Sequence, residues 1–107
     1  MAKVGARSRR KGSAGELEVC HLLRDTLGVD ARRNLTQTRE GGADIIVGPY
    51  NIEVKRRKSI AVYEWIEQAE RSCEGGQRPV VVFRADGKKW MACLPFEEWM
   101  RLAGGEL

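Results

Sequence analysis

The chain has 107 residues, with 19 Lys or Arg and 15 Asp or Glu, which gives a formal net charge of +4 at pH 7. This length favours one domain with one modest core, and the basic balance predicts an acidic partner, most commonly a nucleic acid. No apolar run approaches the ~20 residues that cross a bilayer, and no secretion signal follows the charged N-terminus. These features exclude a membrane role and predict a cytoplasmic location.

Residues 1–12 form a basic leader, and residues 13–27 have the pattern of a helix. The leader has a composition typical of arms that become ordered on binding a partner, and we expect residues 13–107 to form a single domain. Apolar residues of the helix recur at three- and four-residue spacing, at Val19, Cys20, Leu23 and Leu27. Glu16 lies one turn before Val19 on the same face, an unusual place for a carboxylate. Ser13 and Glu16 also match a capping box, in which Glu16 would bind only the backbone of Ser13.

The centre of the chain has the pattern of strands. We expect strands over residues 30–35, 43–47 and 51–57, with a polar loop over 36–42 and a turn at Gly48-Pro49. Side chains alternate along a strand, so Ile52 and Val54 share one face while Glu53 and Lys55 share the other.

The second half adds a helix, a hairpin and a final helix. The helix that begins this half has an apolar stripe from Val62 to Cys73 and ends at Gly75-Gly76. Strands over 79–85 and 89–94 flank the hairpin signal Asp86-Gly87, and residues 96–103 have helical spacing. The order of elements predicts an α/β fold, in which helices pack on the faces of one mixed sheet.

Three acids occur where core residues are expected: Glu16 on the first helix, Asp44 at the head of a buried strand and Glu53 on the next strand. Clustered carboxylates in a low-dielectric site repel one another unless a proton or a cation neutralises them. Mg²⁺ or Mn²⁺ would do so, because hard cations prefer oxygen ligands. Lys55 shares the face of Glu53 and could orient a metal-bound water. This combination predicts phosphodiester hydrolysis.

Each of these features has a simpler interpretation when taken alone. Glu53 and Lys55 could lie on a solvated strand face, Asp44 could be a turn residue, and Gln68 could be an ordinary polar helix residue. Their order along the chain is more specific than any single feature.

The segments KGSAGELE (residues 11–18), GGADIIV (41–47) and IEVKRRK (52–58) resemble the PD-(D/E)XK nuclease superfamily, and among its members archaeal-type and phage Holliday junction resolvases. The resemblance covers most of the chain, from Lys11 to about Val82, although Ala43 replaces the proline of the name motif. It implies a restriction-endonuclease-like α-β-β-β-α-β core, Mg²⁺-dependent phosphodiesterase activity and, for resolvases, a homodimer that acts on four-way DNA junctions.

The same resemblance implies the site residues. Catalytic roles go to Glu16, Asp44, Glu53, Lys55 and Gln68. We expect Glu16, Asp44, Glu53 and the carbonyl of Val54 to hold one or two Mg²⁺, with Mn²⁺ as a substitute. Glu18 is the rival of Glu16 on the first helix, and its direction on the helix disfavours it.

Basic residues flank the acids in sequence, as contacts to DNA phosphates would require. We expect DNA contacts from Arg7, Arg9, Arg10, Lys11, Arg32, Arg33, Arg39, Arg56, Arg57 and Lys58. Their simpler interpretation is a solvated basic face.

The two-fold symmetry of a four-way junction predicts a homodimer, for which Trp65, Trp99 and Met100 are interface candidates that could equally be core. The alternatives are a restriction-like, repair or phage genome-processing nuclease of the same superfamily, or a non-catalytic DNA-binding module. Small size is consistent with a phage or prophage origin, and the location would then be the cytoplasm of a bacterial, archaeal or phage-infected cell.

Overall fold

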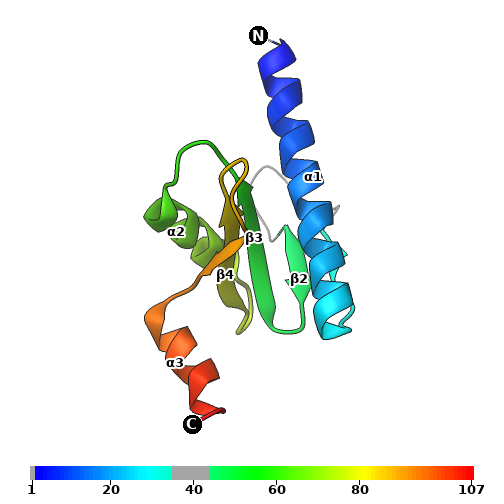
Figure 1. The fold of residues 1–107 in the computed structure, drawn as a ribbon. Helices are drawn as coiled ribbons and strands as arrows, with labels where there is room; N and C mark the ends of the chain where they lie inside the picture. The colour runs from blue at the N-terminus through cyan, green and yellow to red at the C-terminus, as the bar shows by residue number, and fades with distance from the viewer. Residues whose placement is uncertain (1, 35–43) are drawn as a thin grey trace.

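The computed structural model describes residues 2–34 and 44–107, with side chains from residue 13 onward. The first half contains α1 (Ala2–Leu27), β1 (Arg32–Arg33), β2 (Ile45–Val47) and β3 (Tyr50–Arg56). The second half contains α2 (Val62–Ser72), β4 (Arg78–Arg84), β5 (Met91–Cys93) and α3 (Phe96–Gly104) (Figure 1). Each helix and strand expected from the sequence is present, with boundaries shifted by a few residues except at the start of α1.

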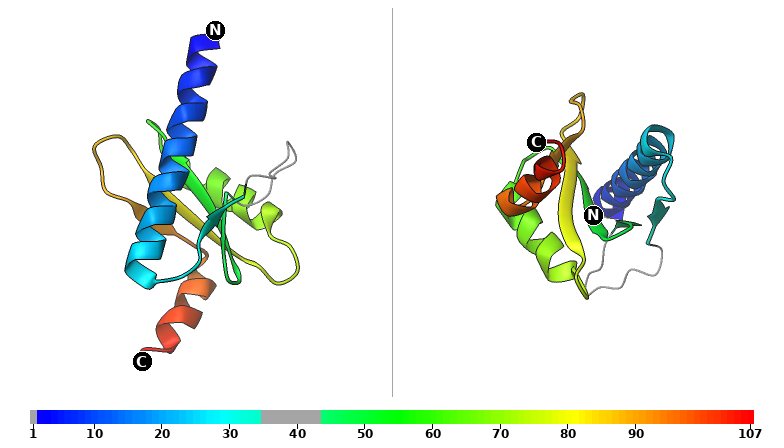
Figure 2. Two further views of the ribbon diagram at one scale, coloured as in Figure 1. Left: turned by 90° about the vertical axis from the view of Figure 1, so that its right-hand side faces the viewer. Right: turned by 90° about the horizontal axis from the view of Figure 1, so that it is seen from below.

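The five strands form one mixed sheet in the order β1-β2-β3-β4-β5. Strands β3 and β4 are parallel, and the other neighbouring pairs are antiparallel. Helix α2 makes the connection between the two parallel strands and covers one face, while α1 covers the other (Figure 2). The predicted α/β fold, with helices on both faces of a mixed sheet, is therefore confirmed.

Strand β3 separates two clusters of apolar side chains. On the α1 side, Val19 and Cys20 pack with Ile45, Ile52 and Val54. The cluster on the α2 side joins Trp65, Ala69 and Val81. Trp65 is only 7% exposed, so it is a core residue and not the interface residue that we considered.

Helix α1 begins at Ala2, well before the expected start at Ser13. Ser13 therefore lies inside the helix, and the capping-box interpretation is wrong because the backbone there is already helical. The N-terminal half of α1 extends beyond the sheet (Figure 1), and the division into an arm and a domain stays a prediction. Among the described residues, no helix combines the length and the apolarity that a membrane crossing needs.

The β4–β5 connection is longer than the two-residue turn that Asp86-Gly87 predicted. Strand pairing ends at Phe83 and Met91. Asp86 and Gly87 form the middle of a turn in which the N–H of Lys88 donates to the carbonyl of Ala85 at 3.1 Å. Residues 85–90 thus make a loop at the end of the sheet where β3 and β4 also end (Figure 1).

The core can be tested with two adjacent isoleucines. Ile45 is fully buried, whereas Ile46 is 40% exposed. We expect Ile45→Ala to lower the free energy of unfolding by about 2–5 kcal/mol, because it leaves a cavity beside Ile52. Ile46→Ala, the matched control, should cost less than about 1 kcal/mol. Urea denaturation measures both, and equal losses would contradict the placement of β2.

Candidate active site

The register of β2 and β3 places two of the three predicted acids opposite each other. Ile45 pairs with Ile52, so the preceding Asp44 lies opposite Glu53. Ile52 and Val54 pack toward α1, and Glu53, which alternates with them, points to the face that α2 covers. Val81, the β4 partner of Glu53, lies in the apolar cluster with Trp65. The carboxyl group of Glu53 is therefore next to core side chains.

Asp44 is buried, and its side chain continues the hydrogen bonding between β2 and β3 beyond the last backbone pair. Its Oδ2 accepts a hydrogen bond from the backbone N–H of Val54 at 2.8 Å, while its own N–H donates to the carbonyl of Ile52 at 3.2 Å. Regular pairing of β2 with β3 ends at Ile45, so the carboxylate takes the place of a strand neighbour for Val54. These bonds hold Asp44 in position and exclude an ordinary surface turn.

Glu53 is the most unusual ionisable residue of the structure. It is 1% exposed, and neither carboxylate oxygen has a hydrogen-bond partner among the described residues. Burial, followed by the negative charge of Asp44, raises the pKa of Glu53 to about 8, although the positive charge of Lys55 acts in the opposite direction. A buried carboxyl group without donors needs either a proton or a cation.

Glu16 reaches the same group of acids from helix α1. Burial and the negative charge of Asp44 raise the pKa of Glu16, while Arg33 opposes this shift. The Nε of Arg33 donates to Oε2 of Glu16 at 3.0 Å, and its Nη2 donates to Oγ of Ser13 at 3.3 Å. Asp44 therefore influences both glutamates, and Arg33 supplies a positive charge at the edge of the acidic cluster, by which we mean Glu16, Asp44 and Glu53.

The structure gives fewer contacts between the acidic cluster and the other predicted site residues, Lys55, Gln68 and Val54. Lys55 is half-buried on the face of Glu53 and close enough to affect its pKa. Gln68 lies on α2 one turn after the buried Trp65, but no hydrogen bond among the described residues joins its side-chain amide to the acids. Val54 uses its N–H to bind Asp44, and a metal-ligand role for its carbonyl stays a prediction.

The residues fit a divalent cation in their chemistry. Three carboxylates influence one another electrostatically, and the buried oxygens of Glu53 accept no hydrogen bond from any described residue. In residues 13–34 and 44–107, however, no three Asp, Glu, His or Cys side chains are arranged to hold one ion. The hydrogen bonds of Asp44 to Val54 and of Glu16 to Arg33 instead direct these carboxylates to protein donors.

The predicted DNA contacts fall into three groups. Arg39 and the side chains of Arg7, Arg9, Arg10 and Lys11 lie outside the described residues. Arg57 and Lys58 are exposed at the end of β3. Three others have acidic partners: Arg32 with Asp30, Arg33 with Glu16 and Arg56 with Asp86.

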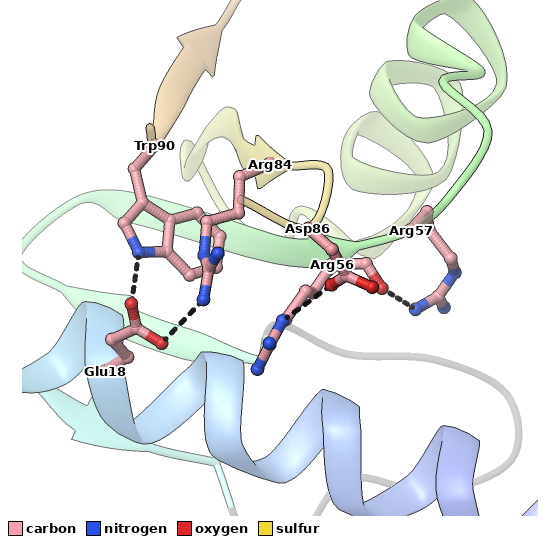
Figure 3. A network of polar contacts seen from close by, with 6 residues as sticks. All are labelled: Glu18, Arg56, Arg57, Arg84, Asp86 and Trp90. Atoms are coloured by element: carbon pink, nitrogen blue, oxygen red, sulfur yellow. Dashed lines mark hydrogen bonds and ion pairs between the residues drawn. The ribbon is translucent and has the colours of Figure 1, made fainter. Parts of the chain in front are cut away.

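Glu18, the rival of Glu16, has different partners (Figure 3). Its Oε1 accepts a hydrogen bond from Nε1 of Trp90 at 3.0 Å, and its Oε2 binds Nη2 of Arg84 at 3.3 Å. These contacts, led by the Trp90 hydrogen bond, lower the pKa of Glu18. Sequence reasoning missed Trp90 and Arg84, because residues so distant from Glu18 gave no local signal.

The elements up to β4 follow the α-β-β-β-α-β order that the PD-(D/E)XK resemblance implies. Asp44 just before β2, Glu53 on β3 and Glu16 on α1 lie on the elements where the resemblance implies acids. A family described as phage putative PDDEXK endonuclease matches residues 7–104 of the chain. The chain belongs to this family. No curated protein and no solved structure matches the chain.

The raised pKa of Glu53 predicts an unusual pH dependence of stability. The folded chain holds a proton on Glu53 that the unfolded chain releases above its ordinary pKa of 4.5. Stability from this group is therefore complete below about pH 4.5 and is lost as the pH rises toward about 8. With chelator present, the wild type should lose on the order of 3 kcal/mol relative to Glu53→Gln between about pH 5 and about pH 8.

Urea denaturation at the two pH values measures this difference. Glu67→Gln, which removes an exposed carboxyl group on α2, is the matched control and should follow the wild type. If Glu53→Gln also followed the wild type, Glu53 would not be a buried acid with a raised pKa.

Proposed function

We propose that the chain is a Mg²⁺-dependent DNA endonuclease that hydrolyses phosphodiesters at four-way junctions. The observation that carries the proposal is Glu53, a buried carboxyl group beside Asp44 and Lys55 that has no donor in the part of the chain that the structure describes. Burying a carboxyl group in this way costs stability, and a binding module gains nothing from that cost. Membership of a phage endonuclease family supports cleavage of DNA, and the preference for junctions rests on the sequence resemblance to resolvases.

The proposed roles follow from the positions of the side chains. Asp44, Glu53, Glu16 and the Val54 carbonyl would hold the cation, which when bound supplies a Lewis acid for the phosphate and the attacking water. Lys55, beside Glu53, would orient that water and stabilise the charge that develops on the phosphate oxygens. Arg33, now bound to Glu16 and Ser13, would contact a DNA phosphate at the edge of the acidic cluster. Gln68 is proposed to assist from α2.

Cleavage is tested with a labelled four-way junction and a linear duplex of the same arm sequences, with Mg²⁺ or with chelator. We expect paired symmetric nicks in the junction only, and none with chelator. Asp44→Asn should lower the rate by at least about 100-fold, because the amide can still accept from Val54 but supplies no charge. Cutting of both substrates would discard the junction preference, and tight binding without cutting would favour a non-catalytic module.

A homodimer is the second part of the proposal. A junction is cut on two opposite strands, and one chain offers one acidic cluster, so a two-fold pair of chains suits the substrate. Helix α3 supports this, because none of its residues is buried and its apolar side chains are exposed, including Phe96, Trp99 and Met100. Trp99 and Met100 therefore remain interface candidates.

We expect light scattering at micromolar concentration to give twice the mass of one chain. Trp99→Ser should shift this mass toward the monomer, whereas Tyr63→Ser, which removes an exposed aromatic side chain on α2, should not. A monomeric wild type that still makes paired nicks would contradict the dimer.

A further inference from the structure

Two basic segments meet at one end of the sheet. Arg56 on β3 pairs in register with Arg84 on β4, and the N–H of Arg57 donates to the carbonyl of Arg84 at 3.2 Å. Residues 55–58 and 84–89 together carry seven basic side chains and one acidic side chain. The two segments meet because β3 and β4 are parallel, so the C-terminal ends of both strands lie at the same end of the sheet.

Polar contacts fix the β4–β5 loop, residues 85–90, against α1 and β3 (Figure 3). Glu18 on α1 binds both Trp90 and Arg84, and the guanidinium of Arg84 lies over the Trp90 ring, 5.0 Å from its centroid. On the other side, Nε of Arg56 binds Oδ1 of Asp86 at 3.3 Å. Both ends of the loop are therefore held in place.

The two lysines of this loop have no side-chain partner among the residues that the structure describes. Lys88 and Lys89 are exposed, and neither side chain forms a hydrogen bond or ion pair with any residue that the structure describes. The acidic groups nearby, Glu18 and Asp86, are already bound to Arg84 and Arg56. Lys88 and Lys89 can consequently contact an external anion without breaking a contact seen here.

Charge is distributed unequally over the molecule. All four lysines with described side chains lie in the two basic segments: Lys55, Lys58, Lys88 and Lys89. Helices α2 and α3 instead carry most of the acids of the second half, Glu64, Glu67, Glu70, Glu97 and Glu98. A polyanion would be steered to the loop end and away from these helices.

We propose that the β4–β5 loop is a DNA-contacting element, in which Lys88 and Lys89 bind phosphates of the duplex next to the phosphate at Lys55. This inference rests on the proposed nuclease function and adds contacts that the sequence analysis did not include. DNA suits this surface better than a protein partner, because exposed lysines contact phosphates as point charges and read no sequence.

The test is the binding of a labelled junction in chelator, measured by fluorescence anisotropy over a series of NaCl concentrations. Lys88→Ala/Lys89→Ala should bind on the order of tenfold more weakly, with a log–log salt slope shallower by about 2, because two phosphate contacts are lost. Lys88→Arg/Lys89→Arg should restore both values, since the charges return. Arg71→Ala/Arg101→Ala removes the same charge from α2 and α3 and should change the affinity much less.

The outcomes separate the loop from the nuclease function. A wild type that binds and cuts DNA, with an unchanged affinity and slope in the alanine pair, would overturn the role of the loop alone. An equal loss of affinity in Arg71→Ala/Arg101→Ala would also overturn the role of the loop, because the loss would then reflect net charge. A wild type that neither binds nor cuts would overturn the nuclease function and the loop with it. Thermal unfolding confirms that each variant is folded.

Discussion

The structure depends on a central strand that is covered on both faces. Strand β3 pairs with β2 and β4, while α1 packs on one of its faces and α2 on the other. Side chains alternate along a strand, so one face of β3 gives Ile52 and Val54 to the α1 cluster and the other must bury Asn51 and Glu53. Asn51 is accommodated by donating from Nδ2 to the carbonyl of Ser72 and to the side chain of Gln77. Neither carboxylate oxygen of Glu53 has a hydrogen-bond partner among the described residues, and the cation that we propose would neutralise this group.

Hydrogen bonds from the protein reach only two of the three carboxyl groups in the acidic cluster. Asp44 is held by the Val54 N–H and Glu16 by Arg33. Glu53 is next to Asp44 and Lys55, and no residue with a described side chain donates to it. Burial raises the pKa of both glutamates. Such an arrangement of buried carboxyl groups lowers the stability of the chain. Binding of the cation that we propose would offset this cost.

Charged side chains are distributed unequally among the elements of the fold. Helices α2 and α3 carry five glutamates, Glu64, Glu67, Glu70, Glu97 and Glu98, whereas the ends of β3 and β4 are basic. Helix α1 links these features, because Glu16 contributes to the acidic cluster and Glu18, half a turn further on, binds Arg84 and Trp90. One short stretch of helix therefore positions both the proposed chemistry and the proposed DNA-contacting loop.

The order of the helices and strands and the alternation along β3 could be predicted from the sequence, because residue spacing and local chemistry depend on neighbouring residues. The same reasoning selected Glu16, Asp44 and Glu53 as candidate acids. It did not give the start of α1, since the basic composition of residues 1–12 carried no apolar stripe. Sequence spacing could not predict that Arg33 binds Glu16, 17 residues away, or that Trp90 binds Glu18, 72 residues away. Nor could it predict that Trp65 is a core residue, or that Glu53 has no donor within residues 13–34 and 44–107. Such facts depend on which distant side chains share a site, and only the packing of α1 and α2 against the sheet brings them together.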